Sequence, residues 1–160
     1  MSITPQEIAE TRGMVSEHNL DIRTITMGIS LMGCADDNLE RMCTKVYDHV
    51  TRTAELLVET AEGLEREYGI PIVNKRVAVT PVAQIASACS DEDLVPLAHA
   101  LDRAAETLGI DYLGGYSALV HKGIGDADRR LMKCIPRALA ETSRVCSSVN
   151  VATLRAGINM

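Results

Sequence analysis

The sequence has 160 residues, of which 46% are hydrophobic and 24% charged, and its formal net charge is −6. This is the size of one ordinary domain with a real core, so we predict a single α/β domain over residues 1–160. The acidic balance opposes contact with a phosphate backbone, and four Tyr without Phe or Trp offer few rings for stacking on bases. These features argue against a nucleic-acid partner.

The cysteines and the N-terminus indicate where the protein is found. An odd number of cysteines without a C-x-x-C pair predicts neither a disulfide framework nor a zinc site, and we expect no metal. The stretch MSITPQEIAETRG has acids where a signal peptide needs bases, and no apolar run approaches the roughly 20 residues of a membrane span. We therefore expect a soluble cytoplasmic protein with no membrane partner.

Helices and strands alternate along the chain. Helices are predicted where apolar residues recur at steps of three and four, and strands where apolar and polar residues alternate. We expect a helix from a Thr4 capping box to about residue 18, followed by a strand over 22–31. A long helix then runs from Asp36 or Asp37 to Gly69 before a strand over 71–80, and a helix from Ser90 or Asp91 to Gly109 precedes a strand over 110–115. The last elements are two short helices over 126–141 that meet at Pro136, and a strand over 143–151.

The order αβαβαβαβ, with long connections, predicts a parallel sheet with crossover helices. Buried parallel strands are usually apolar on both faces, but these strands alternate. Aliphatic residues such as Ile25, Ile29, Val77 and Val145 oppose polar or small residues, among them Thr24, Thr26, Asn74, Arg76, Cys146, Ser148 and Asn150. Arg23, Lys75 and Ser147 are exceptions on the aliphatic side.

The polar parity must meet water, a ligand or partners of its own. An unpaired buried polar group costs about 1–3 kcal/mol, so seven of them would exhaust the stability of about 5–15 kcal/mol that a whole domain has. Two architectures satisfy this requirement: an open sheet with one wet face, or a barrel whose inner wall is polar, and we favour the barrel wall. The aliphatic face is expected to lie under the helices.

The candidate ligand-lining residues follow from this face and from the carboxyl ends of the strands, where α/β proteins bind ligands. They are Ser30, Asn74, Arg76, Thr80, Gly115, Ser117, Ser148 and Asn150. Arg76 could hold a carboxylate or phosphate in bidentate fashion, or pair with an internal acid. The segment GGYS resembles parts of a nucleophile elbow and of a P-loop but matches neither, which favours a tight turn at a strand end.

Cys146 is the weak catalytic candidate. It lies on the polar parity between Arg144 and Ser148, and a neighbouring cation could lower the pKa of its thiol and make it a nucleophile or a radical carrier. A buried, inert cysteine is the commoner alternative. The sequence indicates no particular cofactor.

Several segments resemble one known family: NLDIRTITMGISL, EYGIPIVNKRVAVTP, GGYSALVHKG, AETSRVCSSVNV and AGINM. The chain, from about Glu17 to Met160, is similar to the N-terminal portion of an uncharacterised PFL-like family of bacteria and archaea, domain of unknown function 711, also called uncharacterised protein family 0210. The resemblance implies a longer protein with a ten-stranded α/β barrel of the pyruvate formate-lyase and ribonucleotide reductase type, of which about four strands are present. It also implies homodimers and a neighbouring ACT-domain regulatory protein.

The resemblance brings no reaction with it, so three functional hypotheses stay open. The first is a small-molecule enzyme, or its remnant, with a polar interior cavity where Asn74 and Arg76 orient a small anionic metabolite. The second is a non-catalytic metabolite-binding or regulatory protein that uses the same cavity. The third is a truncated, non-functional fragment that associates through an unpaired sheet edge.

Overall fold

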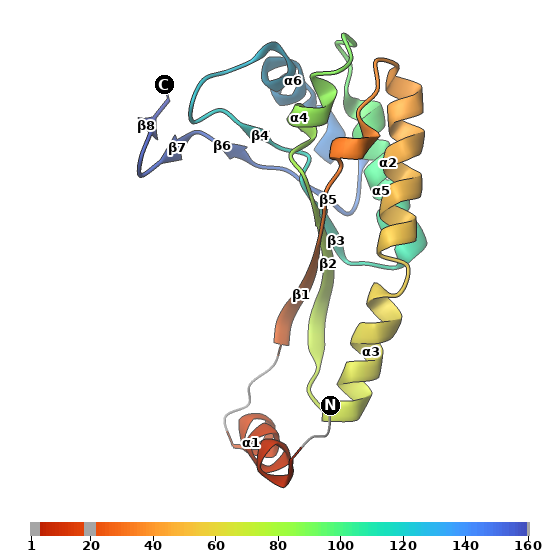
Figure 1. Ribbon diagram of the computed structural model, residues 1–160, viewed down its shortest axis with the longest axis vertical. Coiled ribbons are helices and arrows are strands. Elements are labelled where there is room, and N and C mark those ends of the chain that lie inside the picture. The colour runs from red at the N-terminus through yellow and green to blue at the C-terminus, as the bar shows by residue number, and fades with distance from the viewer. Residues whose placement is uncertain (1–3, 18–21, 160) are drawn as a thin grey trace.

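A parallel sheet lies at the centre of the chain in the computed structural model, which describes residues 4–17 and 22–159. Its strands follow the order β1-β2-β3-β5 (Figure 1), with β1 at Ile22–Ile29, β2 at Ile72–Val79, β3 at Tyr112–Gly114 and β5 at Val145–Cys146. All three neighbouring pairs are parallel. The predicted α/β architecture with a parallel sheet is confirmed.

Two smaller sheets follow. β4 (Ala118–Leu119) pairs in parallel with β6 (Val149–Asn150), and β7 (Ala152–Thr153) forms an antiparallel hairpin with β8 (Gly157–Ile158). The single strand predicted over 143–151 is therefore wrong: it divides into β5 and β6, which belong to different sheets. The division falls at Ser147, whose hydroxyl donates to the Tyr116 carbonyl (2.6 Å) and ties the chain to the segment before β4.

Three helices cover one face of the main sheet. α2 (Leu39–Thr53), α3 (Leu57–Tyr68) and α5 (Val95–Leu108) all lie on the same side of it in Figure 1. The strands contribute buried aliphatic side chains to the core on that side: Ile29, Val77, Val79, Leu113 and Val145. The helices contribute Met42, Val46, Val50, Leu97 and Leu101 to the same core, which is therefore built almost entirely without aromatic rings.

The N-terminal helix α1 (Pro5–Ser16) begins as predicted. The Glu7 backbone N–H donates to the Thr4 hydroxyl, and the Thr4 N–H donates to the Glu7 carboxylate, which completes the capping box. The predicted end near His18 lies outside the described residues. Among the helices described, none combines the length and the apolar character needed to cross a membrane.

The long second helix differs from its prediction in two ways. It is interrupted at residues 54–56, so α2 and α3 are separate helices, although their apolar positions continue the same spacing. The cap of α2 is Asn38, whose side chain accepts from the Arg41 N–H, and neither Asp36 nor Asp37 takes that role. Gly69, in the left-handed conformation with φ 70°, ends α3 as predicted.

The remaining helices were predicted less well. A short helix, α4 (Val82–Ala86), follows β2, where only a segment of small residues was expected. α5 begins at Val95, several residues after the predicted cap. α6 (Asp126–Glu141) continues through Pro136, so the predicted division is wrong. Pro136 removes one backbone donor, but the buried residues Leu131, Cys134 and Ala138 hold both halves of the helix on the same core.

A candidate anion site on the open face of the sheet

The two faces of the main sheet differ as the sequence predicted. Opposite the helices lies a face that we call the open face, formed by the strand positions Thr24, Thr26, Gly28, Asn74, Arg76, Ala78, Tyr112, Gly114 and Cys146. Each of these residues is exposed or half-buried. The pattern fails at the amino end of β2, where Val73 is exposed and Ile72 is buried. Within the described residues the sheet is open, and no closed barrel is formed.

The strand register places the open-face residues in rows across the sheet. One row joins Thr26, Arg76 and Tyr112, which are direct partners on β1, β2 and β3. The next row joins four small residues: Gly28, Ala78, Gly114 and Cys146. The second row therefore forms a low floor beside the longer side chains of Arg76 and Tyr112.

Arg76 is a half-buried cation without a carboxylate partner in the described chain. Its guanidinium carbon lies 5.1 Å from the centroid of the Tyr112 ring, a cation–π contact. Its Nε atom is buried and has no hydrogen-bond partner among the described residues. An unpaired donor on a partly desolvated charge is costly. Because Nε is buried, an anionic ligand would contact the terminal guanidinium nitrogens and offset the charge there.

The opposite face treats its cation differently. Lys75, the next residue along β2, points to the helix side, where its Nζ lies 3.5 Å from the Glu65 carboxylate and donates to the Ile72 carbonyl at 3.2 Å. Lys75, which the sequence placed as an exception on the aliphatic side, is thus paired with an acidic residue of α3. Arg76 has no such acid, because none of the open-face strand positions is acidic.

The other predicted residues of β1 and β2 are used within the fold. The Asn74 side-chain amide donates to the Arg23 carbonyl (3.0 Å), and the Thr80 hydroxyl accepts from the Leu31 N–H (3.1 Å). Ser30 is exposed at the end of β1, and its carbonyl lies 3.1 Å from His49 Nε2. At about 3.3 Å per residue, Arg76 and Thr80 are about 13 Å apart along β2. The strand-end residues therefore do not share a small ligand site with Arg76.

The backbone conformation and the close packing at position 115 require a glycine. Its φ is 126°, and a Cβ there would lie 2.4 Å from Val79 Cγ2 and 2.6 Å from the Val79 carbonyl oxygen. Its carbonyl accepts from the Val82 N–H at 2.9 Å and so starts α4. The GGYS segment is a tight turn between β3 and β4 that lies against the junction of β2 and α4.

Ser117, Ser148 and Asn150 lie away from Arg76. Ser117 is buried, and its carbonyl accepts from the Ala83 N–H. Ser148 and Asn150 are exposed on the arm formed by β4, β6, β7 and β8, which leaves the carboxyl end of the sheet on the side opposite α2, α3 and α5 (Figure 1). The arm thus overhangs the open face. The predicted ligand-lining residues therefore lie in three separate places: on the open face, at the ends of the strands, and on the arm. Arg76, on the open face, is the charged residue among them.

Cys146 is the exposed thiol among five cysteines, and it ends the row of small residues on the open face. The other four are buried. Burial raises the pKa of the Cys43 thiol to about 11 and also raises that of Cys34. Burial therefore disfavours the thiolate form at Cys43 and Cys34, whereas the Cys146 thiol is exposed to reagents in solution.

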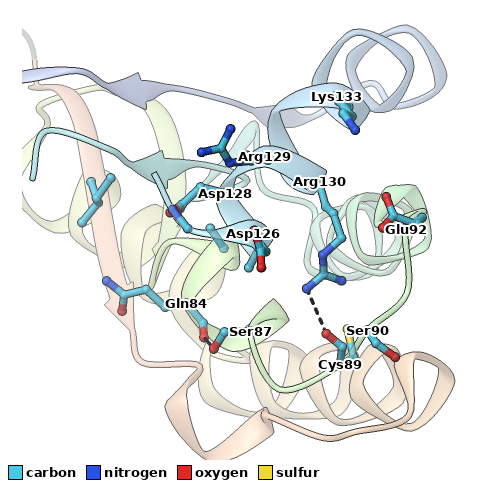
Figure 2. Close-up of a pocket in the computed structure, with 14 residues that line it drawn as sticks. Gln84, Ser87, Cys89, Ser90, Glu92, Asp126, Asp128, Arg129, Arg130 and Lys133 are labelled. Carbon is cyan, nitrogen blue, oxygen red and sulfur yellow. Dashed lines mark hydrogen bonds between the residues drawn. The ribbon is translucent and has the colours of Figure 1, made fainter. Parts of the chain in front are cut away.

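The sequence reasoning did not identify Tyr112, the ring that contacts Arg76. Its signal was its parity, because Tyr112 and Gly114 share a face, but the third strand was too short to assign. It also missed a cavity of about 760 Å³ between α4, the loop after it, β4 and α6 (Figure 2). None of the predicted site residues lines this cavity.

These features define an α/β protein with one helix-covered sheet face and one open face, whose arginine has no acidic partner among the described residues. The family model described as "Uncharacterised ACR (DUF711)" matches residues 13–160, and the chain belongs to this family. It is 58% identical to a UPF0210 protein of Pelotomaculum thermopropionicum over 158 residues, or 99% of this chain and 35% of the relative. It is 57% identical to a UPF0210 protein of Ligilactobacillus salivarius over 96% of this chain and 34% of that relative. The chain thus spans about a third of the length of these relatives.

Proposed function

We propose that the open face binds a small metabolite that carries a carboxylate or phosphate, with Arg76 as the anion contact. The observation that carries the proposal is the half-buried guanidinium of Arg76, which has no acidic partner in the described chain. The Tyr112 ring restricts the guanidinium from one side, which leaves its planar fork available for bidentate binding. The row of small residues beside it leaves room for the body of the ligand.

In the longer relatives, we propose that the remaining chain covers the open face and closes it into the interior of an α/β barrel. Two observations support this proposal. Polar and small residues already line the open face, and the chain spans only about a third of the length of those relatives. Covering the face would lower the local dielectric and strengthen the contact between Arg76 and an anion.

The test is a titration of this chain with inorganic phosphate and with succinate, followed by NMR. We expect Arg76→Gln to weaken binding by at least about tenfold, the equivalent of about 1.4 kcal/mol. The same variant should not lower the free energy of unfolding, because the charge that it removes is partly desolvated and has no acidic partner in the described residues. Arg66→Gln, on the exposed side of α3, is the matched control and should bind normally. Equal binding by the Arg76 variant would refute the proposal.

A second candidate function, catalysis by Cys146, is favoured by its exposure on the same face. We expect an alkylating reagent to modify Cys146 first in the folded chain, with the four buried thiols reacting only after unfolding. Mass spectrometry of tryptic peptides after short exposure measures the order. Protection of Cys146 by phosphate or succinate would place the thiol beside the bound anion, and labelling that the ligand does not change would separate it from the site.

A further inference from the structure

The cavity between α4 and α6 lies apart from the open face. It is lined from α4 by Gln84 and Ser87, from the following loop by Ser90 and Glu92, and from α6 by residues 126–130 and Lys133. Its volume of about 760 Å³ is within the range of small-molecule sites. Arg76, Tyr112 and Cys146 do not line it, so its occupant is independent of the function proposed above.

One wall of the cavity is held rigidly by Arg130. The guanidinium donates to three backbone carbonyls, those of Ala86 (3.2 Å), Cys89 (2.9 Å) and Asp91. Figure 2 shows this side chain reaching from α6 to the loop after α4. The Leu94 N–H also donates to Cys134 Sγ at 3.4 Å, which is a second tie between the same loop and α6. The cavity is thus preformed, which lowers the entropic cost of binding.

The charges around the cavity are of both signs and are not paired with each other. Arg129 and Lys133 are cationic, Glu92 and Asp126 are anionic, and none of the four takes part in an ion pair within the described residues. One turn further along α6 the situation is different, because Arg137 pairs with both Asp93 and Glu141. Within α6, the charged residues Asp126, Arg129 and Lys133, which are of both signs and take part in no ion pair of the described residues, all line the cavity.

The N-terminus of α6 does not supply an anion site of its own. The Asp128 carboxylate accepts from the Gly125 N–H at 2.9 Å, and Asp126 adds a second negative charge in the first turn. A purely anionic ligand would meet these two carboxylates, and a purely cationic ligand would meet Arg129 and Lys133. A molecule that carries one group of each sign satisfies both sets.

We infer that this cavity binds a small zwitterion, with its ammonium group at Asp126 and Glu92 and its acidic group at Arg129 and Lys133. The hydroxyl of Ser90 and the amide of Gln84 also line the cavity and provide further hydrogen-bonding groups for the body of the molecule. Arg130 acts as a positioning residue, because its Nη1 and Nη2 atoms already donate to backbone carbonyls.

The test compares three probes of equal chain length: 4-aminobutyrate, which carries both charges, butyrate and butylamine. Each is titrated into the ¹⁵N-labelled chain, and the amide shifts of Ser87, Ser90 and Asp126 report on the cavity. We expect 4-aminobutyrate to shift these amides and to bind at least about tenfold more tightly than either singly charged probe. Equal binding of butyrate or butylamine, or the absence of shifts at the cavity, would overturn the inference.

Two variants identify the groups that bind. Asp126→Asn and the double variant Arg129→Gln, Lys133→Gln should each weaken 4-aminobutyrate binding by about tenfold or more. The matched controls, Asp48→Asn and the double variant Arg52→Gln, Lys122→Gln, change exposed residues outside the cavity and should bind normally. If Asp126→Asn disturbs the start of α6, the amide spectrum reveals it and the double variant decides. Equal losses in the controls would contradict the inference.

Discussion

Gly115 occupies a position that both the backbone conformation and the packing restrict to glycine. Its φ of 126° disfavours any side chain, and an added Cβ would collide with the backbone and side chain of Val79 on β2. We expect Gly115→Ala to lower the free energy of unfolding by at least about 2 kcal/mol, since strain and close contact add. Urea denaturation measures the change.

The matched control for this substitution is Gly63→Ala. Gly63 lies within α3, and a Cβ there would meet nothing within 4 Å. Alanine is the better helix former, so this variant should gain about 0.5–1 kcal/mol. Similar losses in both variants would mean that the close approach of Gly115 to β2 does not limit stability.

At the scale of elements, Asp36 organises the chain before α2. Its carboxylate accepts from Arg41 Nη2 (2.7 Å), Lys45 Nζ (2.7 Å) and the Asn38 N–H (3.0 Å). Hydrogen bonds from Arg41, then Lys45, then the Asn38 backbone hold the pKa of this carboxyl well below its usual range. Asp36, one of the two residues predicted as the helix cap, instead links two basic residues of the helix to the loop in front of it.

The sign of the pH dependence follows from that direction. A carboxyl whose pKa is lower in the folded than in the unfolded chain adds stability above the unfolded value of about 3.9, and this stability is lost as the pH falls toward the folded pKa. We therefore expect Asp36→Asn to be less stable than the parent chain at pH 7, with a difference that shrinks below about pH 4. Urea unfolding at pH 7, 4 and 3 checks this, with Asp48→Asn as the control. A difference that is the same at each pH would contradict it.

The elements that the sequence predicted are those with local signals. Alternating residues identified β1 and β2, and glycines identified the ends of α3 and α5. The break between α2 and α3 carries no such signal, because Leu57 and Ala61 continue the apolar spacing of α2. α6 continues through Pro136 because tertiary burial outweighs one lost hydrogen bond. β4 has two residues and exists because β6, about 30 residues later, pairs with it.

The same distinction applies to the candidate site. Arg76 could be identified because a charged residue inside an alternating strand needs a partner. Its contact with Tyr112 depends on the register between β2 and β3, which no local pattern encodes. The cavity between α4 and α6 depends on hydrogen bonds from Arg130 to a loop some 40 residues earlier in the chain. No spacing in the sequence indicates these hydrogen bonds.

At the scale of the whole molecule, β1 is an edge of the main sheet. It spans eight residues, lacks proline, and has Ile22 exposed at its start. An uncovered edge of this length presents unpaired N–H and C=O groups and is a template for pairing with another strand. We expect this chain to self-associate through β1 with a dissociation constant that Ile22→Lys raises by at least about tenfold, since lysine on an edge strand opposes pairing.

Sedimentation velocity over a range of concentrations distinguishes this edge pairing from general hydrophobic association. Ile8→Lys is the matched control, because Ile8 is 58% exposed on α1, whereas Ile22 is 42% exposed on the sheet edge. If exposed apolar area drives association, both substitutions should weaken it, and Ile8→Lys should do so at least as strongly. If β1 pairs with a second copy, only Ile22→Lys should shift the chain to monomers. A monomer at all concentrations in the parent chain would show that the edge does not pair in solution.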